Sequence, residues 1–398
     1  MTKQKIVGII VLILFVFGLL QFDDFSTVRY SSFLFLTFSV FILFFSKSFN
    51  RVLLNFGLSV ILLMVIHSVI NYQTVDWKIL LNFNVLLVST LSIVNYLLSK
   101  GAFGNAKYGK LIIYITYLLF VILMISTWGL RTSSLNHQYA KIYELTSMPK
   151  QMLGVLAGWF LCYVLAYEIK RRKIWTAIVY FSILGFMILS LLGIRSFILG
   201  FIGILIFFAL SRKALNFMVI TAIIFFVPLV YFTDFEVPTA FLFDIRGVML
   251  DASLNIARSS PIGIGIGGYD EYLTNIYRLN TGDYSSTGLE YRYIKSAVDV
   301  NVLESDLLVW MVSFGAAITA LIYYLWIKWL GFLKYSNKIT SFNRFVYFIN
   351  VYYLFSGFTQ DHFLTFHWWV LILLNLYYYF KVGLGEKDSN CQSARWTR

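Results

Sequence analysis

The feature that most constrains this chain is a succession of long apolar stretches. A helix needs about 20 apolar residues to cross a bilayer, and twelve stretches reach or approach that length, at 6–22, 30–46, 52–70, 79–98, 111–129, 151–169, 174–193, 196–211, 214–232, 306–327, 345–360 and 363–380. Apolar residues make up 59% of the 398 residues, and only 13% are charged. A soluble fold cannot bury that much apolar surface. The sequence therefore predicts an all-α, polytopic membrane protein with about 12 transmembrane helices in a single domain, 1–398.

The charged residues predict how these helices are oriented. The first stretch follows two lysines and has no small-residue cleavage site after it, so we expect a retained signal anchor with a cytoplasmic N-terminus. Alternating the spans from there also places the C-terminal tail, 381–398, in the cytoplasm. The inner segments then hold 21 of the 32 basic residues and three of the 19 acidic ones. This positive-inside bias accounts for the net charge of +13 without a nucleic-acid partner.

One outer segment, 233–305, is much longer than the other connections, and long loops are usually functional. Apolar residues at helical spacing predict a helix over 239–259, and Ser260-Pro261 should end it. A second short helix is expected from Tyr269 to Leu279. The sequence thus predicts one large periplasmic loop that contains short helices.

A glycine run, Pro261–Gly268, lies between these two predicted helices. A dinucleotide-binding loop would need a preceding strand and a βαβ unit, which are not expected here. Two interpretations stay open for Gly263, Gly265 and Gly267. The run is either a tight turn at the membrane surface or a place where backbone amides approach an anionic ligand.

Three arginines are candidates for binding such an anion. Arg195 interrupts an apolar sequence at the outer boundary, where a charge is costly unless it faces a cavity, a partner or the interface. Arg246 and Arg258 lie in the predicted loop helix near the glycines. Guanidinium groups bind phosphates through two parallel hydrogen bonds. Three arginines at one outer cavity would suit a pyrophosphate-linked lipid, although each of the two loop arginines also fits a solvated helix face.

Acid–base candidates are few. Glu304 and Asp306 stand where the long loop re-enters the membrane, and His362 lies in the short turn before the last span. Such border positions favour function, but structural ion pairs are equally common there. A lone histidine in the third span, His67, is interpreted as a packing residue. No His, Cys, Asp or Glu cluster has the spacing of a metal site, so we expect neither a metal nor a cofactor.

Tyrosines crowd the second half of the long loop. Tyr269 and Tyr272 are the first two of six between 269 and 293. Rigid aromatic faces with a hydroxyl suit sugar rings. Anchoring of the loop at the membrane interface explains them equally well.

Three local patterns together resemble the superfamily of O-antigen polymerases (Wzy) and O-antigen ligases. The sequence Gly-Ile-Arg-Ser at 193–196 resembles a Gly-x-Arg-Ser span of that family. Arg246, a helix and then Ser260-Pro261 with its glycines resemble the family's Arg…Pro…Gly-x-Gly loop. Glu304-Ser305-Asp306, followed by Phe314-Gly315, falls where ligases have His-Asn and then a glycine. The resemblance covers roughly 190–330.

The resemblance implies a metal-independent membrane glycosyltransferase of the bacterial inner membrane, with its active site facing the periplasm. Donor and acceptor would be undecaprenyl-diphosphate-linked oligosaccharides, and the product an O-antigen or capsule polymer. Arg195, Arg246 and Arg258 would hold the diphosphate, and Glu304 would be the base. Membrane lipids, a chain-length regulator and a flippase are the implied partners.

Three alternatives are kept beside the polymerase. Glu304 at the ligase histidine position favours polymerase over ligase, which is the nearest alternative. A lipid-linked oligosaccharide flippase shares twelve spans but normally shows repeated halves or charged and broken helices near mid-membrane. A polyprenyl-monophosphate-sugar transferase would use carboxylates such as Asp23-Asp24, in a loop too short to build that site.

Overall fold

The computed structural model describes residues 49–100, 195–209, 245–267, 305–335, 341–358 and 366–380, with single positions between 155 and 221. Every secondary-structure element in these ranges is a helix, which confirms the all-α prediction for this part of the chain. The bounds are α3 Arg51–Ile70, α4 Trp77–Lys100, α9 Arg195–Ala209, α11 Ile245–Ser259, α14 Asp306–Phe314, α15 Ala316–Tyr335, α16 Ser341–Ser356 and α17 Phe366–Tyr378.

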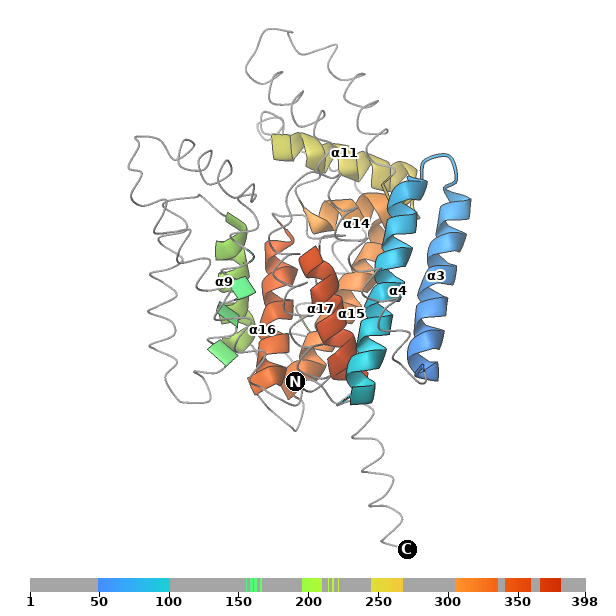
Figure 1. The fold of residues 1–398 in the computed structure, drawn as a ribbon. Coiled ribbons are helices and arrows are strands. Elements are labelled where there is room, and N and C mark those ends of the chain that lie inside the picture. Colours follow the sequence, from blue (N-terminus) through green and yellow to red (C-terminus); the bar gives the residue numbers. More distant parts are fainter. Residues whose placement is uncertain are drawn as a thin grey trace, which may run out of the picture.

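Three of these helices are long and apolar enough to cross a membrane. They are α3, the segment Trp77–Leu98 of α4, and the segment Ala316–Lys334 of α15. Shorter apolar helices lie in α9 and α17. Figure 1 shows α3, α4, α15, α16 and α17 running side by side as a bundle. The helices support a membrane protein, while the number of twelve spans stays a prediction.

One predicted span is wrong in its continuity. The apolar stretch 306–327 forms two helices, α14 and α15, which Gly315 separates in a left-handed conformation with φ +83°. A Cβ atom at Gly315 would overlap the carbonyl group of Pro261 in the long loop. The close approach of two backbones thus requires glycine here. Hydropathy cannot show such a break, because both sides of it are equally apolar.

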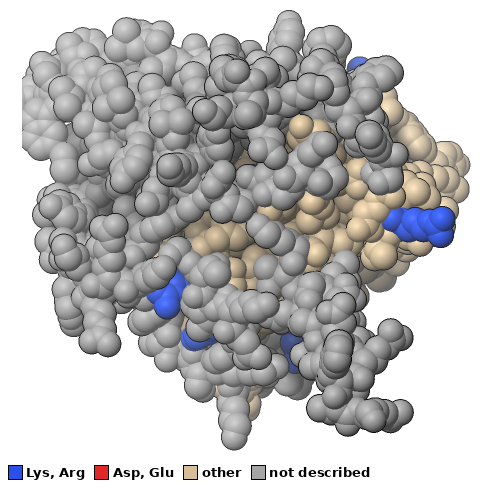
Figure 2. Space-filling model, turned by 60° about the horizontal axis from the view of Figure 1, so that its bottom comes forward, with Lys and Arg blue, Asp and Glu red and all other residues tan. Residues whose placement is uncertain are grey.

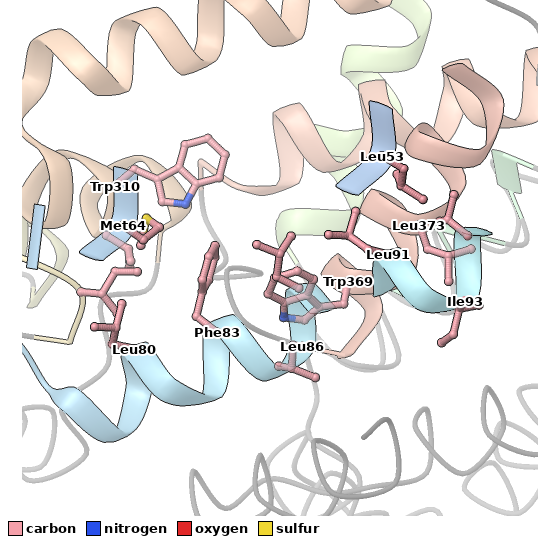
Figure 3. Close-up of a cluster of buried hydrophobic side chains, with 14 of the residues drawn as sticks. Leu53, Met64, Leu80, Phe83, Leu86, Leu91, Ile93, Trp310, Trp369 and Leu373 are labelled. Atoms are coloured by element: carbon pink, nitrogen blue, oxygen red, sulfur yellow. The ribbon is translucent and has the colours of Figure 1, made fainter. Parts of the chain in front are cut away.

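The core of the bundle lies between α3, α4, α14 and α17 (Figure 3). The indole of Trp369 on α17 packs edge-on against Phe83 of α4, with ring centroids 5.2 Å apart. Leucines and isoleucines of α4 and α17 fill the space around this pair, including Leu86, Leu91 and Leu373. Lipid tails are as apolar as leucine side chains, so membrane helices associate through close packing of this kind.

Glycines allow α9 to pack closely on α16. The fully buried ring of Tyr352 on α16 lies against the backbone of Gly200 on α9 and of Gly158. A Cβ atom at either glycine would overlap that ring. Gly203 stands in the same relation to Phe355. Small residues that admit a neighbouring side chain are typical of membrane helix interfaces.

A polar network joins α15, α16 and α17. The carboxamides of Asn350 and Asn375 donate to each other at 2.8 and 2.9 Å. The indole N–H of Trp326 donates to the Asn350 oxygen at 3.1 Å, and that of Trp329 to the Asn375 oxygen at 2.8 Å. Each amide oxygen therefore accepts two hydrogen bonds, which ties three helices together in one register.

Basic residues gather at the lower end of the bundle. Arg51 begins α3, Lys334 lies in the last turn of α15, and Arg344 lies in the first turn of α16. The Lys334 ammonium donates to the carbonyl of Phe207 near the C-terminal end of α9, at 2.6 Å. Figure 2 looks toward this lower end and shows basic but no acidic side chains among the coloured residues. The distribution agrees with the predicted orientation, in which this end faces the cytoplasm.

Candidate functional site

The predicted loop helix exists and ends where Ser260-Pro261 predicts. Helix α11 runs from Ile245 to Ser259 and lies crosswise over the upper end of the bundle (Figure 1). It packs on α14 and the start of α15 through Leu254 and Ala257, which are buried with Met311 and Ala316. Asn255, on the opposite side of the helix, is exposed. The arginines of α11 are therefore carried at the end of the bundle that opposes Lys334.

The glycine run continues directly from α11 as an irregular segment. Gly263, Gly265 and Gly267 all have left-handed conformations, with φ of +77°, +92° and +73°. Added Cβ atoms would overlap the backbone of Ser313 at Gly263, and the side chain of Val75 at Gly265. Glycine is required at alternate positions because the run is squeezed between two other parts of the chain.

The first of these parts is the C-terminal end of α14. The amide of Ile264 donates to the carbonyl of Val312 at 2.9 Å, and that of Gly265 to the carbonyl of Ser313 at 3.1 Å. Carbonyls in the last turn of a helix lack partners within the helix. The glycine run supplies those partners, so the break at Gly315 is filled by protein.

The second part is the last turn of α3 with the connection to α4, residues 67–76, which we call the corner. His67 Nε2 lies 2.9 Å from the carbonyl oxygen of Ile262. The hydroxyl of Thr74 donates to the carbonyl of Ile264, and the amide of Asp76 donates to the carbonyl of Ile266 at 3.0 Å. Alternate carbonyls of the run thus point to the corner.

These bonds bear on the two interpretations of the run. The amide of Gly263 donates to Ser260 at 2.8 Å, so the amides of residues 263–265 all donate to protein carbonyls. The tight-turn interpretation accounts for these three residues. Ligand contact by Gly263, Gly265 or Gly267 stays a prediction, and it does not use the amides of the first two.

A buried carboxylate begins the helix that receives the run. Asp306 is 1% exposed, and its amide donates to the carbonyl of Gly357 at the end of α16, at 2.8 Å. The hydroxyl of Ser305 donates to the same carbonyl at 3.1 Å. A Cβ atom at Gly357 would overlap the Asp306 side chain. With nine residues, α14 is about 14 Å long, so Asp306 and the glycine run stand at its opposite ends.

The helix start changes the expectation for Glu304. If Glu304 and Asp306 shared a helix, only one carboxylate could face the arginines. The helix begins at Asp306, and Ser305 is its N-cap residue in an extended conformation. The shared-helix argument therefore does not apply, while the match of Glu304 to the ligase histidine position, which selected it over Asp306, is not affected by the helix start. Glu304 itself lies outside the described residues, and its role as the base stays a prediction.

The remaining predicted site residues fall into two groups. Arg258 is half-buried in the last turn of α11, Arg195 begins α9 at the upper end, and Arg246 lies in the first turn of α11. The side chains of the last two are not among those described. Three predicted residues lie outside the described residues altogether: Tyr269, Tyr272 and His362.

Sequence reasoning missed the corner. His67 was expected only to pack, and it does contact Phe314, with ring centroids 5.4 Å apart. Its bond to the glycine run was not foreseen, nor were those of Thr74 and Asp76. The available signal was a set of polar residues at the outer end of an apolar stretch. Spacing alone could not link them to a run almost 200 residues away.

No protein-family model, curated protein or solved structure matches this chain. In the part of the chain that the structure describes, no three His, Cys, Asp or Glu residues come together as a metal site. Assignment of a function therefore rests on the sequence motifs and on how the described residues are arranged.

Proposed function

We propose that the protein polymerises undecaprenyl-diphosphate-linked oligosaccharide repeat units into a surface polysaccharide, an O-antigen or a capsule. The reaction would take place on the outer face of the bacterial inner membrane without a metal. The observation that carries the proposal is the position of α11. This helix brings Arg246 and Arg258 to the end of the bundle at which α9 begins with Arg195 and α14 begins with Asp306 (Figure 1).

The arrangement suits transfer from a diphosphate leaving group. An acceptor hydroxyl would bond to the anomeric carbon of the donor sugar while the bond from that carbon to the diphosphate oxygen breaks. Arg195, Arg246 and Arg258 would stabilise the charge that develops on the diphosphate. A carboxylate, with Glu304 as our candidate, would accept the hydroxyl proton. Undecaprenyl diphosphate would then leave with its negative charges paired.

The break between α14 and α15 also bears on the flippase alternative. Transporters use discontinuous helices whose exposed carbonyls coordinate ions at mid-membrane. Here the carbonyls of Val312 and Ser313, next to the break, accept hydrogen bonds from the glycine run. The break adjoins the outer loop, and protein amides occupy it. This supports a structural role for the break rather than an ion site.

A reconstituted assay separates the proposal from its alternatives. Purified protein in liposomes would receive short undecaprenyl-diphosphate-linked repeat units, and the products would be resolved by size. A polymerase yields a ladder of lipid-linked chains that differ by one repeat. A ligase yields no such ladder and instead joins a chain to an added lipid A core. A flippase moves the substrate between leaflets and leaves its length unchanged.

A further inference from the structure

The strongest unexplained feature is the set of bonds between the corner and the glycine run. Two side chains of the corner make such bonds. His67 Nε2 lies 2.9 Å from the carbonyl oxygen of Ile262, and the Thr74 hydroxyl donates to the carbonyl oxygen of Ile264. Neither residue lies in the region 190–330 that carries the sequence motifs. The connection between α3 and α4 lies at the end of the bundle that also carries α11 (Figure 1).

We propose that His67 and Thr74 are positioning residues for the glycosyl transfer. They fix the glycine run, and through it the C-terminal end of α11 with Arg258, relative to α14. This inference rests on the proposed function. It extends the proposed site to α3 and α4, in which none of the motif residues lies.

Hydrogen bonds and a few residues of backbone link His67 to Arg258. Ile262, whose carbonyl faces His67, follows Arg258 by four residues. Between them, the amide of Ser260 donates to Ile256 of α11 and the amide of Gly263 donates to Ser260, both at 2.8 Å. A shift of the Ile262 carbonyl is therefore passed to the last turn of α11. No free linker absorbs it.

The opposite edge of the run is held as firmly. The amides of Ile264 and Gly265 donate to the carbonyls of Val312 and Ser313, the two residues that precede the last residue of α14. The run is thus bonded to α14 through its amides and to the corner through its carbonyls. Removing the His67 and Thr74 bonds leaves the α14 side and the bond from Asp76 to Ile266, so the part of the run nearest α11 loses its hydrogen bonds to the corner.

The hydrogen-bond chemistry of His67 makes the claim specific. A carbonyl oxygen only accepts, so a hydrogen bond from His67 to Ile262 requires the proton on Nε2. The Asn71 amide nitrogen, which also lies 3.3 Å from Nε2, then donates to the His67 carbonyl at 3.1 Å. Nδ1 is buried and has no hydrogen-bond partner in the described part of the chain. Glutamine places an N–H₂ group the same number of bonds from Cα as Nε2, whereas asparagine places it at the position of Nδ1. Glutamine should therefore keep the bond to Ile262, and asparagine should lose it.

Thr74 allows an independent pair of variants. Its hydroxyl donates to Ile264 and also lies 3.2 Å from the carbonyl of Asn71. Thr74→Val keeps the shape and removes the donor, while Thr74→Ser keeps the donor. Ser68→Ala is the matched control, because the Ser68 hydroxyl donates to Met64 within α3 at 2.7 Å and not to the run.

The experiment measures elongation kinetics and backbone exchange on the full chain in liposomes. Misplacing a reacting group by about 1 Å costs up to about a hundredfold in rate. We expect His67→Asn and Thr74→Val to lower kcat at least about tenfold, with wild-type membrane level and Tm. His67→Gln, Thr74→Ser and Ser68→Ala should stay within about twofold of wild type. Hydrogen–deuterium exchange of the Ile264 and Gly265 amides should rise only in the two impaired variants.

Several results would overturn the inference. Wild-type kcat in both His67→Asn and Thr74→Val removes the positioning role while leaving the proposed function intact. Equal losses in His67→Asn and His67→Gln, or losses that follow Tm and protein level, show a role in stability alone. A wild-type protein that elongates nothing contradicts the proposed function and this inference with it.

Discussion

At the scale of single residues, two glycines at the upper end of the bundle are explained by close approach of backbones. Gly315 sits in a left-handed conformation against Pro261, and Gly263 sits in one against Ser313. Both contacts lie where α11, the glycine run and α14 meet. The sequence left a tight turn and a ligand contact open for the glycine run, and nothing in it indicated that the run would lie against a break in an apolar helix.

Gly315→Ala should destabilise the protein by at least about 2 kcal/mol, because a side chain must adopt positive φ and displace the Pro261 carbonyl. Gly331→Ala is the control, since a Cβ atom there meets nothing within 4 Å. Alanine is the better helix former, so this change should be neutral or slightly stabilising. Thermal unfolding in detergent compares them. Equal Tm values for the two variants would refute the close contact.

Arg195→Ala and Arg246→Ala should abolish measurable elongation while the protein still inserts in the membrane. Loss of one charge-assisted donor to a developing phosphate charge costs about 3 kcal/mol, or roughly a hundredfold in rate. Lysine should rescue poorly, because a point charge does not replace the guanidinium fork. Polymer of normal length from Arg195→Ala cells would exclude the diphosphate role.

Glu304→Gln tests the proposed base, because it keeps shape and removes charge. If Glu304 accepts the proton, turnover should fall about a hundredfold with little change in donor KM. If it pairs with an arginine instead, protein level or substrate binding should fall. Asp306→Asn is the comparison at the buried carboxylate next in the chain. Normal elongation by Glu304→Gln membranes would show that Glu304 is not the base.

At the scale of elements, polar side chains hold apolar helices in register. The reciprocal bond between Asn350 and Asn375 receives two indole N–H groups, from Trp326 and Trp329. A double-mutant cycle with alanine at both asparagines should give a coupling energy of about 1 kcal/mol. Asn84→Ala is the control, since the Asn84 amide donates to Leu80 of its own helix. Additive effects of the two alanines would show that the pair does not couple α16 to α17.

At the scale of the whole molecule, composition predicts the class of fold and little of the tertiary contact. Apolar stretches indicated α3 and α4 within about two residues, because each stretch is bounded by polar turns. The bounds of α14 and α15 could not be predicted, because the helix break at Gly315 follows from a contact with the long loop. The corner was missed for the same reason: its bonds to Ile262 and Ile264 join distant parts of the chain.

The predicted orientation has its own test. Reporter fusions at Lys173 and Lys338 should report the cytoplasm, and a fusion at Gly282 should report the outer side, because basic residues collect in the predicted inner segments. A cytoplasmic signal from Gly282 would reverse the orientation. The proposed chemistry on the outer face would then fail as well.

The most direct test of polymerisation is the stoichiometry of the reconstituted reaction. Purified protein in liposomes, with excess EDTA and undecaprenyl-diphosphate-linked repeats, should release one undecaprenyl diphosphate for each new glycosidic bond. Mass spectrometry should show a series of lipid-linked chains that grow by one repeat, and Arg258→Ala should slow the whole series. Substrate that stays one repeat long, with no undecaprenyl diphosphate released, would contradict the proposed function.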